Sequence, residues 1–214
     1  MGLPQIGRMA ALAILGIAFS GAGAAAGTRC GPDPAVEIVA LDGSVSIEAP
    51  DGGRATARLG DTVCRGDLVA TGDDGRVELR FRHDETTIGL ARNTSVRIPE
   101  ASGGVELTSG LMRFISSVRE LFTIRTRHAN AGIDGTEAVV ATDPDGTLVL
   151  VIEGEVTLQA AGTALALPAG AAGFAAPGAA PRPAEPATVP PAFRALVVEP
   201  EGASDWAIHI PPIL

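Results

Sequence analysis

Short β-type runs separated by turn residues fill residues 36–167, and this alternation constrains the fold more than any other feature of the sequence. The turn signals include Asp42-Gly43, Gly66-Asp67, Asp134-Gly135, Asp145-Gly146 and Glu153-Gly154. Asp and Gly favour the tight turns that join neighbouring strands, and no helical periodicity of useful length interrupts the runs. The pattern predicts an all-β domain, either a multi-stranded sandwich or a short solenoid-like stack, with a Pro/Ala-rich tail.

Two runs indicate how individual strands are exposed. In residues 76–82, Val77, Leu79 and Phe81 alternate with charged residues, which predicts a strand with one buried and one solvent-exposed face. Residues 147–152 are apolar without alternation, so we expect this strand to be covered on both faces.

The first 26 residues have the three parts of a secretory signal peptide. Arg8 is their only charged residue, an apolar run covers residues 9–19, and small residues lead to Ala26. Because a membrane-spanning helix needs about 20 apolar residues, cleavage is favoured and an uncleaved anchor is the alternative. No second run of that length follows, so we expect a periplasmic mature chain without a transmembrane segment.

The chain has two cysteines, Cys30 and Cys64. Neither belongs to a CxxC motif or a Cys/His cluster, and Arg29 does not fit a lipoprotein processing site. Cysteine pairs in exported proteins are usually oxidised, so the sequence favours a Cys30–Cys64 disulfide over two free thiols.

The charge distribution narrows the class of partner. The chain carries 25 acidic and 16 basic residues, for a net charge of −9, which argues against nucleic acid as a partner. Residues 76–127 are locally basic, with nine arginines and six acids. A candidate face for an anionic envelope polymer or an acidic protein comprises Arg76, Arg80, Arg82, Arg125 and Arg127. The alternative is a solvated strand face with Arg/Glu cross-strand pairs.

No group of residues predicts catalysis, a metal site or a cofactor. His83 stands beside Asp84 and Glu85 in a turn-type sequence, and neither G-x-S-x-G nor H-E-x-x-H occurs. Acidic residues at 73–75 and 143–146 lack a full calcium ligand set, and hairpin turns explain them more simply. We therefore expect a protein that is not an enzyme, and an uncharacterised hydrolase is the weakest alternative.

Several of these pieces follow one another in a recognisable order, namely residues 42–47, 59–71, 76–81, 87–95, 131–137 and 148–158. On these residues the chain resembles the FecR-type periplasmic domain family over residues 36–173. The best match is the motif Asp134-Gly135-Thr136-Glu137, which we interpret as a structural turn. Gly135 would supply a positive φ and Thr136 a side-chain hydrogen bond. The chain departs from the family at Asp84-Glu85-Thr86, where Asp-Gly-Thr is usual.

The resemblance implies a β module that recognises a partner or serves as a scaffold. Too few residues precede the apolar run for a segment that binds a sigma factor, so the chain resembles the exported branch of the family. We expect a signal peptide at 1–26, the FecR-like domain at 27–173, a Pro/Ala-rich linker at 174–192, and a last segment at 193–214. That segment either docks on the domain or leads into missing tetratricopeptide repeats.

The function expected from the sequence is non-catalytic periplasmic binding of a protein or an envelope polymer. A structural role in the cell envelope is the alternative.

Overall fold

A computed structural model describes residue 30 and residues 36–83, 86–100, 103–116, 122–185 and 187–193. Strands make up most of these residues, which confirms the predicted all-β class. No helix in the described ranges is long and apolar enough to cross a membrane. The predicted signal peptide (1–26), the family departure at Asp84 and Glu85, and residues 194–214 lie outside the described residues.

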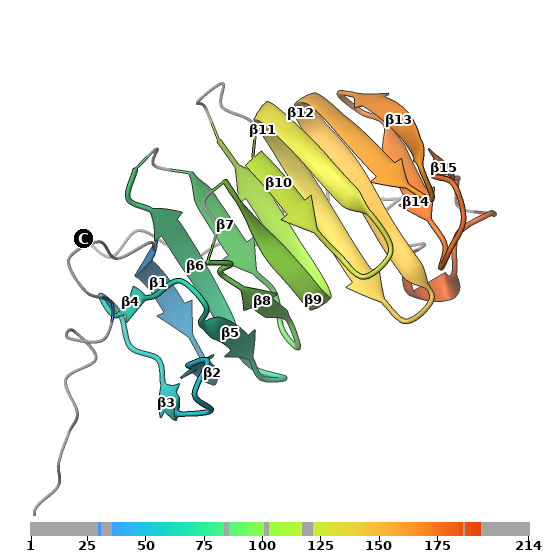
Figure 1. Ribbon diagram of the computed structural model, residues 1–214. Helices are drawn as coiled ribbons and strands as arrows, with labels where there is room; N and C mark the ends of the chain where they lie inside the picture. The colour runs from blue at the N-terminus through green and yellow to red at the C-terminus, as the bar shows by residue number, and fades with distance from the viewer. Residues whose placement is uncertain are drawn as a thin grey trace, which may run out of the picture.

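Among the residues that the structure describes, fifteen strands form one sheet, in which only the β9–β10 pair is parallel. Their bounds are β1 Val36–Asp42, β2 Val45–Glu48, β3 Arg54–Thr56, β4 Thr62–Val63, β5 Leu68–Thr71, β6 Arg76–Phe81, β7 Thr87–Leu90, β8 Ser95–Arg97, β9 Gly104–Ile115, β10 Phe122–Arg125, β11 Asn130–Asp143, β12 Gly146–Ala160, β13 Thr163–Pro168, β14 Ala172–Ala175 and β15 Arg182–Pro183. Figure 1 shows them following one another across the molecule, from β1–β4 at one end to β13–β15 at the other.

The sheet is rolled into two layers, which we call the first and the second. The first layer has the order β4-β1-β6-β7-β9-β11-β12-β14-β15. The second has the order β3-β2-β5-β8-β9-β10-β11-β12-β13. β9, β11 and β12 belong to both because each bends midway. In β12, for example, residues 147–150 pair with β14 and residues 155–160 pair with β13.

Glycines with positive φ lie at the three bends. Gly110 in β9, Gly135 in β11 and Gly154 in β12 have φ values of 93°, 56° and 84°. Other residues adopt this backbone region only at a cost. The prediction that Asp134-Gly135 and Glu153-Gly154 are turns between strands was therefore wrong. Both dipeptides lie inside continuous strands. A glycine inside a strand marks such a bend or bulge.

The main core fills the space between the layers. It contains fully buried side chains from both, including Leu79 of β6, Val69 of β5 and Leu158 of β12. Three phenylalanine rings join the layers at one point. Phe122 lies 5.3 Å from Phe81 and 4.8 Å from Phe114, measured between ring centroids.

A second apolar cluster covers the outer face of the first layer. Leu148 and Leu150 belong to it, whereas Val149 and Val151 face the main core, which explains the absence of alternation in this strand. Residues after β15 cover the cluster. Val189 and Phe193 are buried there, and the Phe193 ring lies 5.7 Å from that of Phe174.

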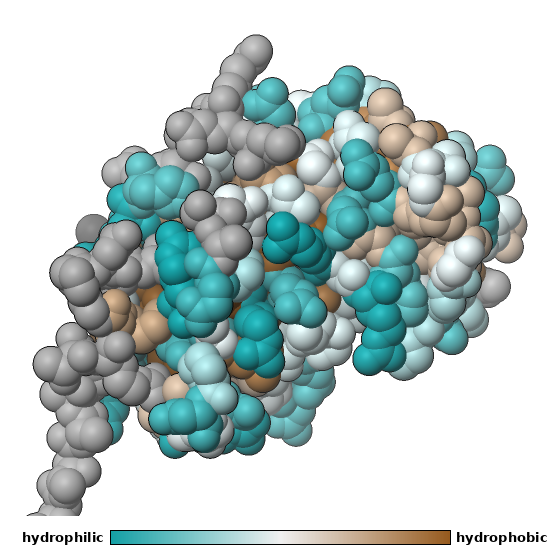
Figure 2. Space-filling model, viewed as in Figure 1, coloured by the Kyte–Doolittle hydropathy of each residue, from teal (hydrophilic) through white to brown (hydrophobic). Residues whose placement is uncertain are grey.

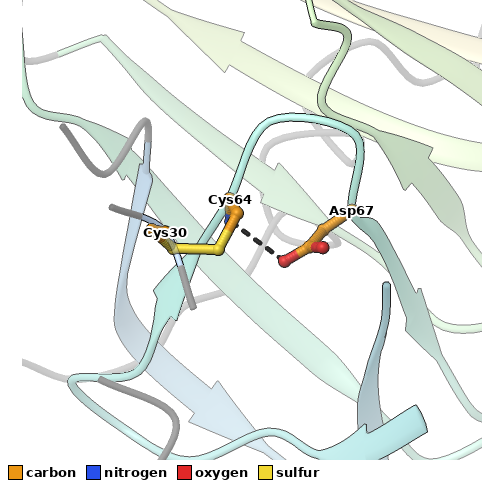
Figure 3. Close-up of a disulfide and its surroundings, with 3 residues drawn as sticks. All are labelled: Cys30, Cys64 and Asp67. Carbon is orange, nitrogen blue, oxygen red and sulfur yellow. Dashed lines mark hydrogen bonds between the residues drawn. A yellow bond between two sulfur atoms is a disulfide. The ribbon is translucent and has the colours of Figure 1, made fainter. Parts of the chain in front are cut away.

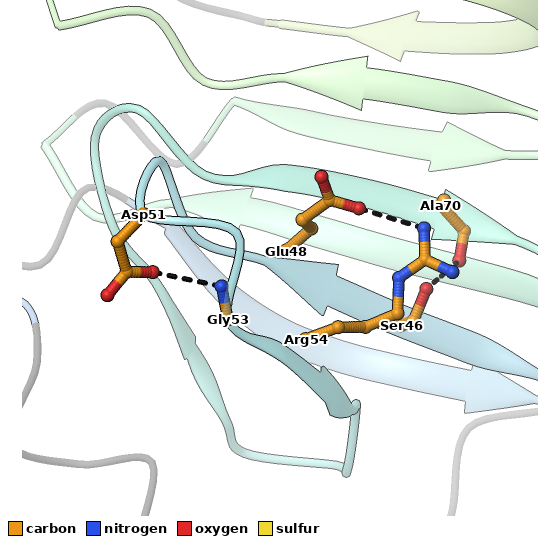
Figure 4. A network of polar contacts seen from close by, with 6 residues as sticks. All are labelled: Ser46, Glu48, Asp51, Gly53, Arg54 and Ala70. Atoms are coloured by element: carbon orange, nitrogen blue, oxygen red, sulfur yellow. Dashed lines mark hydrogen bonds and ion pairs between the residues drawn. The ribbon is translucent and has the colours of Figure 1, made fainter.

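The β2–β3 hairpin forms one edge of the second layer (Figure 4). Arg54 pairs with Glu48 at 2.8 Å across it, and the Asp51 carboxylate accepts the Gly53 N–H at 3.0 Å in the turn. All three residues of β3 are exposed. A short, charged edge strand of this kind discourages pairing with other chains.

Candidate functional site

The disulfide predicted from the sequence is present and joins Cys30 to Cys64. Cys64 follows β4, and its N–H donates a hydrogen bond of 3.0 Å to the buried Asp67 carboxylate (Figure 3). The bond therefore ties the segment before β1 to the β4 edge of the first layer.

The motif Asp134-Gly135-Thr136-Glu137 forms the bend of β11, where the register with β12 shifts. The Thr136 hydroxyl is within donating distance of two carbonyl oxygens, that of Asp134 at 2.9 Å and that of Glu155 at 3.1 Å. Gly154 faces the bend, and a Cβ there would stand 2.9 Å from the Gly135 carbonyl oxygen. The two strands thus bend together, with backbone against backbone.

Glu137 has a partner that sequence reasoning missed. Its Oε1 accepts a hydrogen bond of 3.0 Å from Nε of Arg113 on β9, and Nη2 of the same guanidinium also contacts it. Both side chains are about four-fifths buried. Only the β9–β11 register, which sets Arg113 opposite Val139, brings the two charges together.

The five arginines singled out in the sequence do not form one face. Arg76 and Arg82 pair with Asp42 (3.8 Å) and Glu37 (3.0 Å), both on β1. Arg80 is exposed beside them on β6. These two ion pairs agree with the alternative of a solvated strand face.

Arg125 and Arg127 lie elsewhere. Arg125 is exposed on β10, in the second layer, and Arg127 is exposed in the loop that follows. Leu79 of β6 and Ile124 of β10 both point into the main core from opposite layers. Arg80 and Arg125 therefore project from opposite outer faces of the molecule.

The carboxylates weighed as calcium ligands cap turns. Asp143 accepts the N–H groups of Asp145 (2.8 Å) and Gly146 (3.2 Å), and Asp74 accepts that of Ser44 (3.1 Å). Within the described ranges, no three His, Cys, Asp or Glu side chains gather as a metal site.

A hollow lies on the outer face of the second layer, over β10, β11 and β12, and we call it the trough. It encloses about 650 Å³, and its lining comprises Thr123, Asn130, Gly132, Asp134, Gly135, Gly154, Glu155, Thr157 and Gln159. The strand positions between these residues point into the main core. Figure 2 shows teal, hydrophilic residues over much of the molecular face that it views and tan residues over the β13 end.

The cross-strand register orders the trough into rows. Asp134 stands opposite Glu155 at the bend, Gly132 opposite Thr157 in the middle, and Asn130 opposite Gln159 beyond. A second hollow of about 400 Å³ shares Asn130 and Gln159 and continues to the β12–β13 turn. From Glu155 to Ala160 the strand covers roughly 17 Å at the usual rise per residue.

The groups that line the trough can form hydrogen bonds with a ligand. Carboxylates, amides, hydroxyls and glycine backbone line it, and no His, Cys, Ser or Lys does. The sequence alone did not reveal this site, because residues at alternate positions of β10, β11 and β12 become neighbours only through the register.

The comparison with known families agrees with the resemblance seen in the sequence. The family described as "FecR protein" matches residues 67–157. This stretch contains the bend motif and every residue that lines the trough except Gln159. The predicted resemblance is therefore confirmed for a FecR family domain at residues 67–157.

Two solved structures are similar to part of the chain. Both are crystal structures of a "putative anti-sigma factor" from Parabacteroides distasonis ATCC 8503, with sequence identities of 18% and 17% and TM-scores of 0.49 and 0.48. Each match covers 55% of this chain and 59% of that protein. No protein of curated function matches the chain.

Proposed function

We propose that this chain is a periplasmic recognition module of the FecR type, which binds a protein or an envelope polymer and catalyses no reaction. The FecR family domain supports a role in recognition. The disulfide supports export, because such bonds persist in oxidising compartments. A signal peptide at residues 1–26 would direct that export.

The trough is the observation that carries the proposal. It lies on regular strands whose other face is anchored in the main core, so the backbone that carries its lining residues is fixed before any ligand arrives. Its floor includes Gly132, which leaves backbone accessible between the rows. A rigid concave surface with many hydrogen-bonding groups is suited to binding.

The test is retention of envelope material by the mature chain, residues 27–214, immobilised on a resin. The material is offered as three fractions, namely peptidoglycan, anionic surface polymers and periplasmic proteins. We expect one fraction to be retained by the native chain and lost with Gly132→Val, which fills the trough floor. Ala55→Val adds the same side chain on the exposed strand β3 and should leave retention unchanged.

Retention of nothing above an empty resin would overturn the proposal. Equal retention by the native chain and by Gly132→Val would show that the retained material does not bind in the trough. Recovery of the retained polymer uncut agrees with a role in binding alone, whereas shortened chains would contradict it.

A further inference from the structure

The trough lacks the anchors of a protein–protein interface. Of the residues that line its larger hollow, three are glycines, and the other six are Thr, Asn, Gln, Asp or Glu. Peptide and protein partners gain most of their affinity by inserting aromatic or aliphatic side chains into well-packed pockets. No apolar side chain lines this hollow to receive one.

The six polar side chains are also unused by the fold. No hydrogen bond or ion pair joins the side chains of Thr123, Asn130, Asp134, Glu155, Thr157 or Gln159 to any described residue. Elsewhere on the molecule, surface groups such as Glu37, Asp42 and Arg54 are paired. These six side chains therefore remain available to a ligand.

Their donor and acceptor pattern matches a polyol. Each amide of Asn130 and Gln159 both donates and accepts hydrogen bonds, as do the hydroxyls of Thr123 and Thr157. A sugar hydroxyl also donates and accepts, so adjacent hydroxyls can meet such groups in pairs. The carboxylates of Asp134 and Glu155 add acceptors at the bend.

Charge opposes an anionic strand at the bend of the trough, whereas at the other end Arg125 of β10 stands opposite Asn130. Asp134 and Glu155 stand directly opposite each other, and no cationic side chain lines either hollow. An anionic polymer would meet two carboxylates without compensation. The two hollows share Asn130 and Gln159, and together they run along the strands, which suits a linear chain of several units.

From these observations we infer that the trough binds a strand of uncharged glycan along β11 and β12. This inference rests on the proposed function and names the class of its ligand. The contacts are hydrogen bonds from the amide and hydroxyl rows to the sugar hydroxyls. Without an aromatic platform each unit is held weakly, so several linked units are needed.

The test is a titration of the ¹⁵N-labelled mature chain, followed by the NMR shifts of its backbone amides. The probes are the tetramers of N-acetylglucosamine and of glucose, with trilysine as a cationic peptide. We expect at least one tetramer to shift amides in residues 130–134 and 155–161. Thr157→Val and Gln159→Leu should each weaken binding about 3- to 10-fold, the effect of losing one or two modest hydrogen bonds.

Two variants serve as controls. Thr56→Val makes the same change as Thr157→Val on the exposed strand β3 and should leave the affinity unchanged. Glu155→Gln is the control for charge, because it removes one carboxylate and should weaken the binding of a cationic ligand such as trilysine.

The contrary results separate this inference from the function on which it rests. Binding of trilysine alone, lost in Glu155→Gln, would overturn the glycan class and leave recognition through the trough standing. If the glycan affinity is unchanged in Thr157→Val and in Gln159→Leu, the glycan binds outside the trough. No binding of either tetramer, with a protein retained from the envelope fractions, would also overturn the inference but not the proposed function.

Discussion

Gly135 and Gly154 face each other where β11 and β12 bend, and both have positive φ. We predict that Gly135→Val lowers the free energy of unfolding by more than about 1 kcal/mol, because a β-branched residue is strained in this backbone region. Chemical denaturation measures the change. A difference within error would show that the glycine is incidental to the bend.

A matched pair separates backbone strain from crowding. Gly162 also has positive φ but has open space around the position of a Cβ, whereas a Cβ on Gly154 would stand 2.7 Å from the Thr136 hydroxyl oxygen. Gly154→Val should therefore destabilise the fold more than Gly162→Val does. Equal losses would show that strain alone matters at the bend.

The ion pair between Arg113 and Glu137 supports a second prediction. A double-mutant cycle with Arg113→Met and Glu137→Gln should give a coupling energy of about 1 kcal/mol, since the pair is hydrogen-bonded and largely buried. The exposed pair Arg54–Glu48 serves as the control and should couple by less than about 0.5 kcal/mol. A smaller coupling for Arg113 and Glu137 than for the control would contradict the prediction.

Single residues were predictable where their backbone role is local. The need for glycine at position 135 follows from the turn-type residues around it, and the structure gives it a φ of 56°. The partner of Glu137 was not predictable, because it lies 24 residues away and the register alone brings it near. The trough was not predictable for the same reason, because its rows combine residues from three strands.

At the scale of elements, the Cys30–Cys64 bond closes a loop with a sequence separation of 34. Reducing it should lower the free energy of unfolding by about 3 to 4 kcal/mol in the chain-entropy description. Denaturation with and without a thiol reductant gives the value, and the Cys30→Ser/Cys64→Ser variant should match the reduced protein. Two thiols titrating in the native, oxidised protein would contradict the bond itself.

Strand assignment succeeded where side chains alternate and failed where strands bend. β6 was predictable because Val77, Leu79 and Phe81 share its buried face. The full lengths of β11 and β12 were not, because positive-φ glycines within them resemble the ends of strands in the sequence. Tertiary pairing keeps these strands continuous through the bend.

At the scale of the whole molecule, the segment 193–214 remains a prediction beyond Phe193. Trp206, Ile208 and Ile210 alternate with less apolar residues, and each would gain roughly 1.5 to 3 kcal/mol by burial. We predict that this segment docks on the β domain. Trp206 is the sole tryptophan of the chain, so its fluorescence reports on the segment alone.

A blue-shifted emission that resists acrylamide is the expected result for docking. The same protein in denaturant provides the exposed reference. Emission as red-shifted and as easily quenched as that reference would refute docking and favour a segment kept for another partner.

The order of strands in space has a consequence for how the chain folds. Strands early in the sequence gather at one end of the molecule and late strands at the other, with β9 between them (Figure 1). A chain that emerges N-terminus first can therefore add each new strand to a template already formed, and loop closures stay short. The pairing of β1 with β6 skips the most strands and must wait for β2–β5. We expect nascent chains to gain protease resistance in steps, first when β6 has emerged and again when β12 completes both layers.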